Sequence, residues 1–126
     1  MTTEAWNAYN NEKYELAIEK AQLCIDTFEE KAREMQNAIT SPPKTGLVNE
    51  EEKAEIHKNW AVNDVGASLF IMGISYMKLG KEDEARAAFE KCRDFSNARV
   101  WDPNDRIFWS PFEGAEIELQ KLPIPK

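Results

Sequence analysis

Basic residues, cysteine, histidine and long apolar runs are all scarce in this sequence of 126 residues. The chain has 16 Lys and Arg against 23 Asp and Glu, so its net charge is −7. Phosphate binding needs a basic surface, and a nucleic-acid partner is therefore not expected. Cys24 and Cys92 are too few for a disulfide scaffold, and we expect small buried thiols. The single histidine, His57, has no partner at ligand spacing, so neither a metal nor a cofactor is predicted.

Targeting and membrane signals are scarce as well. No run approaches the roughly 18 apolar residues of a membrane span, so membrane insertion is not expected. The N-terminal segment lacks the basic start and apolar core of a signal peptide, which favours a cytoplasmic location. A leader removed in processing, or a domain cut from a longer protein, stays open. With 42% hydrophobic and 31% charged residues, the composition is that of one soluble globular domain.

What the chain does have is helical periodicity. Residues 3–10 predict a short helix, and residues 13–39 predict a long helix with an apolar stripe in steps of three and four. Two prolines mark residues 40–47 as a loop. Asn49 with Glu52 predicts the start of a helix that runs to residue 79, with a kink near 64–66 and Trp60 beside Phe28.

The stretch around residues 66–96 resembles the tetratricopeptide repeat. A large apolar residue, the spacing of an L-G-x2-Y element and a later A-x3-F element are its signature. Their positions are filled by Leu69, Met72, Gly73, Tyr76, Ala85 and Phe89, while Asn97 replaces the closing proline. A second, degenerate match covers residues 1–28, because Lys13, Ala17, Cys24 and Asp26 recur as Lys81, Ala85, Cys92 and Asp94.

This resemblance implies an all-α fold made of antiparallel helix hairpins in a short solenoid. The expected domain covers residues 1–122. It comprises a degenerate repeat (1–39), a loop (40–47), an extended repeat (48–96), and an aromatic turn with a capping helix (97–122), followed by a tail (123–126). No nucleophile with a base, phosphate loop or cofactor fingerprint stands out, so a non-catalytic scaffold that binds a protein or peptide is predicted.

The resemblance also indicates a binding face on the first helix of the later repeat. The groove candidates are Trp60, Asn63, Ala67, Phe70, Ile74, Met77 and Lys78. These residues are mostly apolar. The chain therefore differs from those tetratricopeptide-repeat proteins that bind the C-terminal carboxylate of a partner with polar and basic side chains on this face. The same face could instead be buried on the long helix 13–39. The acidic surface favours a basic partner, and self-association stays open.

The segment after the repeat is rich in aromatic residues. Trp101, Phe108 and Trp109 could form an exposed platform for a sugar or a partner, or could plug the end of the helix stack. The motifs WAVNDVG and WDPNDRIFWSP are similar to helical-repeat modules attached to bacterial envelope or glycan-acting proteins. That likeness implies an alternative function, which is glycan or partner binding through Trp101 and Trp109. Ser110 and Pro111 predict the start of the capping helix.

Overall fold

The computed structural model describes residues 2–123, which form six α-helices, one 3-10 helix and two short strands. The predicted all-α class is confirmed, whereas the solenoid arrangement stays a prediction. Among these residues no helix combines the length and the apolar character that crossing a bilayer requires. In chain order the elements are α1 (Thr3–Asn10), α2 (Tyr14–Ala38), α3 (Glu50–Lys58), α4 (Trp60–Lys78), α5 (Glu82–Cys92), η1 (Arg93–Phe95), β1 (Val100–Asp102), β2 (Ile107–Trp109) and α6 (Pro111–Lys121).

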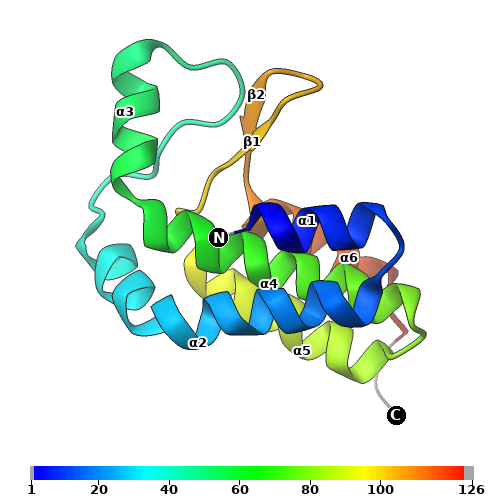
Figure 1. Ribbon diagram of the computed structural model, residues 1–126. Helices are drawn as coiled ribbons and strands as arrows, with labels where there is room; N and C mark the ends of the chain where they lie inside the picture. Colours follow the sequence, from blue (N-terminus) through cyan, green and yellow to red (C-terminus); the bar gives the residue numbers. More distant parts are fainter. Residues whose placement is uncertain (1, 124–126) are drawn as a thin grey trace.

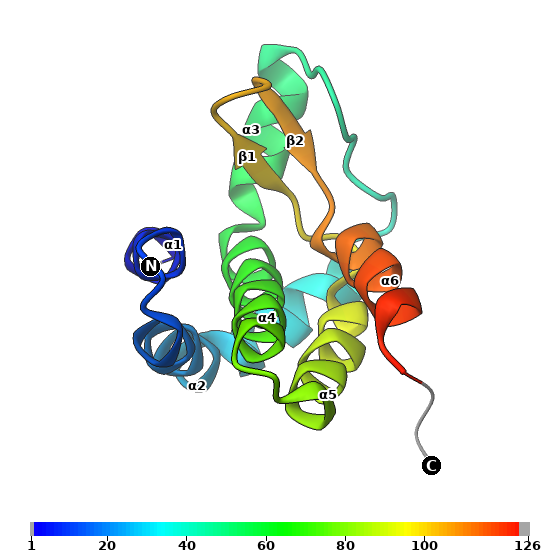
Figure 2. The ribbon, with the colours of Figure 1, turned by 90° about the vertical axis from the view of Figure 1, so that its right-hand side faces the viewer.

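Helix α4 is the centre of the molecule. Figure 2 shows it nearly end on, with α1 and α2 on one side and α5 and α6 on the other. Most of its residues are buried, including Val62, Val65, Leu69 and Ile71. A helix that is apolar around most of its circumference must be covered around most of it. Helices α1, α2, α5 and α6 therefore pack around α4.

Small residues bring α1 close to α2 and α4. Ala5 and Ala8 of α1 form a buried cluster with Ala17 of α2 and Ile71 of α4. The predicted seam of α2 is confirmed at Ala21, Ile25 and Ala32, which belong to the main core. Leu16 and Leu23, which lie outside this seam, are exposed.

The turn between α1 and α2 has the same backbone geometry as the turn between α4 and α5. Glu12 and Gly80 both have left-handed backbones, with φ of 61° and 73°. Lys13 N–H donates to Ala8 C=O at 2.8 Å, and Lys81 N–H donates to Tyr76 C=O at 2.9 Å. This is the hydrogen bond of the Schellman motif, in which the residue after the left-handed one donates back to a carbonyl of the last helical turn. The turns of the two helix hairpins thus have the same geometry.

The helix predicted over residues 50–79 is broken at Asn59, and the kink predicted near residues 64–66 is wrong. The side chain of Asn63 donates to Ile56 C=O at 2.8 Å and so satisfies a carbonyl at the end of α3. Helix α3 then points away from the helical body (Figure 1). Helix α4 is continuous past Gly66. The predicted contact of Trp60 with Phe28 is confirmed, since their ring centroids lie 5.1 Å apart.

The part of α4 around Phe70 and Gly73 faces α5 and α6. A Cβ on Gly73 would lie 2.4 Å from the ring of Phe89, and a Cβ on Gly114 would lie 2.7 Å from the ring of Phe70. Each glycine therefore makes room for one phenylalanine. The sequence left open that the face with Phe70 is buried on the long helix 13–39. Phe70 does not follow that alternative, because its ring packs against Phe89, Trp109 and Gly114 instead.

The segment between α5 and α6 forms a small antiparallel hairpin. Trp101 pairs with Phe108, and Gly46 of the long loop forms a bridge on the other side of Phe108. In Figure 1 the hairpin rises beside α3, away from the helical body. Helix α6 begins as predicted, since Ser110 Oγ accepts from Glu113 N–H and Pro111 occupies the first turn. Of the predicted tail, 124–126 lie outside the described residues.

Candidate ligand-binding groove

The residues predicted to line the groove are divided by the structure into two groups. Phe70, Ile74 and Met77 are partly buried against the core, together with Leu119 and Leu122 from the C-terminal end. Lys78 is exposed at the end of α4. Trp60, Asn63 and Ala67 instead line a cavity of about 400 Å³ at the other end of α4. The chain itself therefore covers the part of the predicted groove at Phe70, Ile74 and Met77. The part at Trp60, Asn63 and Ala67 stays open.

The open half meets the aromatic segment that was predicted as a separate site. Trp101 and Phe108 line the same cavity as Trp60, with α1 on the opposite side. A second cavity of about 430 Å³ adjoins it and is lined by Trp109 and again by Trp101. The residues common to both cavities are Thr3, Trp6, Val100, Trp101 and Pro103. We call the two cavities together the aromatic groove.

All four tryptophans of the chain line this groove, although they come from α1, α4, β1 and β2. Trp6 packs edge-on against Trp109, with 6.2 Å between ring centroids, and Trp109 packs against Phe70 at 5.1 Å. Trp60 and Trp101 retain 42% and 44% exposure. Trp109 thus joins the groove to the core, and Trp101 is the more open platform.

The hairpin is held over the groove by buried polar contacts. Arg99 is 8% exposed, and its guanidinium donates to Pro43 C=O at 2.8 and 3.1 Å. It also donates to the carbonyls of Ser96 and Ala98. Burial lowers the pKa of Arg99. These contacts occupy the guanidinium, which therefore acts as a structural link between the loop and the hairpin.

Asn63 is occupied in the same way. Its amide nitrogen donates to Ile56 C=O, and its amide oxygen accepts from Arg99 N–H at 2.9 Å. The predicted ligand-binding role of this side chain is therefore better described as positioning, because both of its polar atoms hold the groove wall.

The charged groups left for a ligand are few. Asp64 lines the cavity beside Trp60, and burial raises the pKa of its carboxyl. Asp102 lines the second cavity, together with Asn7, Asn10 and Asn104. His57 packs edge-on to Phe108, and the Lys53 ammonium lies 5.9 Å from the centre of a Trp101 ring. Since the Arg99 guanidinium is occupied, the cavity beside Asp64 suits a ligand with apolar groups and a positive charge. Asp102 is less free, because its Oδ1 accepts from the N–H groups of Asn104 and Asp105.

Sequence reasoning missed the contribution of α1 and of Asp64. Residues 3–10 were predicted only as a short helix, and Asp64 only as part of a kink. The one signal in the sequence was the set of four tryptophans in a chain this short. Nothing in their spacing predicts that they converge.

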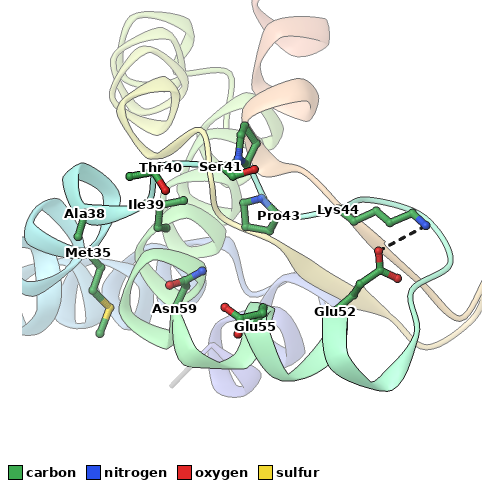
Figure 3. Close-up of a pocket in the computed structure, with 11 residues that line it drawn as sticks. Met35, Ala38, Ile39, Thr40, Ser41, Pro43, Lys44, Glu52, Glu55 and Asn59 are labelled. Atoms are coloured by element: carbon green, nitrogen blue, oxygen red, sulfur yellow. Dashed lines mark ion pairs between the residues drawn. The ribbon is translucent and has the colours of Figure 1, made fainter.

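Figure 3 shows a third cavity, of about 580 Å³, whose lining residues differ from those of the aromatic groove. It is enclosed by the end of α2, the proline-containing loop and α3. Glu52 on its wall forms an ion pair with Lys44 at 3.5 Å, and Glu55 pairs with Lys58 at 2.9 Å. Because both carboxylates already have lysine partners within the chain, this cavity is a weaker candidate for a site than the aromatic groove.

Comparison of the chain with protein-family models, with curated proteins and with solved structures gives no match.

Proposed function

We propose that the chain is a non-catalytic binding module that takes a segment of a protein partner into the aromatic groove. The observation that supports this function is the convergence of all four tryptophans on one concave surface. Buried aromatic side chains supply much of the binding free energy in protein interfaces. Trp60 and Trp101 are large, partly exposed and already held by their neighbours, so they would lose little conformational entropy on binding.

The charge of the chain favours a basic partner. The net charge is −7, and two carboxylates, Asp64 and Asp102, line the groove. The pKa of Asp64 is raised because its charged form is poorly solvated. A lysine or arginine of the partner placed beside Asp64 would favour that charged form. The same acidity argues against nucleic acid as a partner. We also propose a cytoplasmic location.

We further propose that the chain is a divergent tetratricopeptide-like module. The shared turn at Lys13 and Lys81 supports this assignment, as does the fit of Gly73 to Phe89. Both features follow the register of the motif. Assembly as a homo-oligomer is not part of the proposal.

Affinity capture of partners from the native host, with variant chains as bait, tests the main proposal. Trp101→Ala and Trp60→Ala should each reduce capture of a specific partner about 30-fold, the effect of losing a hot-spot side chain. Leu23→Ala is the matched control, because Leu23 is 56% exposed on α2 and lies outside the groove. Equal capture by all four chains, each with an unchanged circular dichroism spectrum, would contradict the proposal.

A second candidate function is glycan binding in the cavity lined by Trp109. Asn7, Asn10 and Asn104 line that cavity beside the indoles of Trp6 and Trp101. Amides that face an aromatic ring suit the hydroxyl groups and the apolar face of a sugar. Acrylamide should quench the tryptophan fluorescence of the chain, and a neutral oligosaccharide such as cellohexaose should protect the part of that signal that Trp101→Phe lacks. No protection at millimolar sugar would remove this candidate.

A further inference from the structure

The hydrogen bonding of the hairpin shows which way the backbone of Trp101 points. Phe108 N–H donates to Gly46 C=O at 3.0 Å, and Gly46 N–H donates to Phe108 C=O at 2.7 Å. In a strand, the N–H and C=O groups of one residue point to the same side. Phe108 therefore directs both groups away from β1. Since Trp101 is paired with Phe108, the two form a non-hydrogen-bonded pair.

The N–H and C=O of Trp101 must then point to the open side of β1. Within residues 2–123, neither group has a hydrogen-bond partner in the chain. Gly46 covers the outer edge of β2, but no strand of the described part of the chain covers the outer edge of β1. Figure 2 shows β1 on the side of the hairpin that faces away from the long loop. An unpaired strand edge of this kind is a template for another chain.

This open edge runs along the aromatic groove. Val100, Trp101 and Pro103 line both cavities, with Thr3 and Trp6 of α1 on the opposite wall. Backbone groups that need a partner thus lie beside cavities that can accept side chains. The proline after β1 cannot donate a hydrogen bond, so it limits pairing to the neighbourhood of Trp101.

The two cavities meet at the open edge of β1, where Val100, Trp101 and Pro103 contribute to both. Trp101 and Phe108 share one face, because paired residues point the same way, and Phe108 lines the cavity beside Trp60. Asp102 and Trp109 belong to the other face and line the second cavity. A strand laid along β1 would send alternate side chains to these two faces.

We propose that the occupant of the aromatic groove is an extended segment of a partner protein, which adds a strand to the open edge of β1. This inference rests on the proposed function and specifies how the partner binds. The segment exchanges two hydrogen bonds with Trp101. An aliphatic or aromatic side chain enters the cavity beside Trp60, and a lysine or arginine of the segment lies near Asp64 or Asp102. This is β-strand addition, with affinity from the backbone and specificity from the alternate pockets.

Amide hydrogen exchange in the free chain tests the open edge without a ligand. The amide of Trp101 should exchange about 100-fold faster than that of Phe108, which donates to Gly46. Both residues belong to the same hairpin, so opening of the whole hairpin affects them alike. Equal protection of the two amides would show that the edge is closed and would overturn the strand-addition proposal.

Peptide selection tests the occupant. Random peptides of about twelve residues, displayed on phage, are selected on the full chain, and an enriched peptide is synthesised with single N-methyl groups along its backbone. Strand addition predicts alternation. N-methylation at the residue paired with Trp101 weakens binding about 10-fold or more, and N-methylation of its two neighbours does not.

The outcomes separate the two proposals. If Trp101→Ala abolishes binding but N-methylation at every position is tolerated, the groove is correct and strand addition is wrong. If enriched peptides bind Trp101→Ala and Trp60→Ala as well as the natural chain, the groove itself is wrong. Failure to enrich any peptide would likewise count against the groove as a peptide site.

Discussion

Gly73 shows how one missing side chain decides the packing of two helices. The ring of Phe89, which is fully buried, occupies the space where a Cβ would lie. In an isolated helix, alanine is favoured over glycine by about 1 kcal/mol. Here Gly73→Ala should instead lower the free energy of unfolding by about 1–2 kcal/mol, because overpacking costs about 1–3 kcal/mol. Urea unfolding followed by circular dichroism measures the change.

The double variant is the control for this prediction. Phe89→Leu alone leaves a cavity, but combined with Gly73→Ala it leaves room for the new methyl group. The two effects should therefore be non-additive, with the double variant more stable than their sum predicts. Additive losses, or a more stable Gly73→Ala variant, would show that the ring does not occupy this space.

Cys92 should make stability depend on alkaline pH. Burial raises the pKa of its thiol from the ordinary 9.0 to about 12. Above about pH 9 the thiol ionises in the unfolded chain while the folded chain keeps its proton. The unfolded state then binds fewer protons, so the free energy of unfolding falls as pH rises towards 12, by about 1.4 kcal/mol per pH unit.

Comparison with Cys92→Ala isolates this contribution from the other groups that titrate in the same range. The loss of stability between pH values of about 8 and 10 should be smaller in Cys92→Ala by about 1.4 kcal/mol. Native Cys92 should also react with a thiol reagent no faster than the chain unfolds. Rapid modification of the folded chain would contradict its burial.

At the scale of elements, the two helix hairpins have turns of the same geometry, and we expect substitutions at these two turns to change stability in opposite directions. Gly80 adopts the left-handed backbone without strain, whereas Glu12 adopts it at a cost of about 1 kcal/mol. Gly80→Ala should therefore lower the free energy of unfolding by about 1 kcal/mol, and Glu12→Gly should raise it by about 0.5–1 kcal/mol. Thermal unfolding of both variants provides the comparison.

The control at the first turn is Glu12→Ala. It removes the charge of Glu12 but keeps a side chain on the left-handed backbone, so stability should stay close to that of the natural chain. If Glu12→Gly is the less stable of the two, the strain at this turn has been misjudged.

At the scale of the whole molecule, Arg99 joins the long loop to the hairpin. Its guanidinium reaches three carbonyls, of Pro43, Ser96 and Ala98. A lysine ammonium has three donors on one atom and cannot reach all of these carbonyls in the same geometry. Arg99→Lys should loosen the loop and expose the bond after Lys44, so that trypsin cleaves there about 10-fold faster.

Arg106→Lys is the matched control. Arg106 lies in the exposed turn of the hairpin, and the same substitution there keeps the charge and the number of trypsin sites. Mass spectrometry identifies the cut. Equal cleavage after Lys44 in both variants would mean that Arg99 does not hold the loop.

Local patterns predicted most of the helices and their ends. The capping box at Asn49 and the cap at Ser110 were recognised because the cap and its partner are separated by three residues, and both caps are present. The apolar stripe of α2 and the contact of Trp60 with Phe28 followed from helical periodicity. The break at Asn59 was missed because its cause, the bond from Asn63 to Ile56, competes with an otherwise continuous apolar pattern.

By itself, the sequence determined the all-α class, the helix starts at Asn49 and Ser110 and the tetratricopeptide-like motif, because each depends on residues a few positions apart. Only the tertiary structure decided which part of the predicted face is open. Phe70 is covered because Gly114, far along the chain, makes space for its ring. The tryptophans converge because α4 buries most of its circumference and gathers α1 and the hairpin at one end. Such long-range packing has no period in the sequence, so the aromatic groove became visible only in the fold.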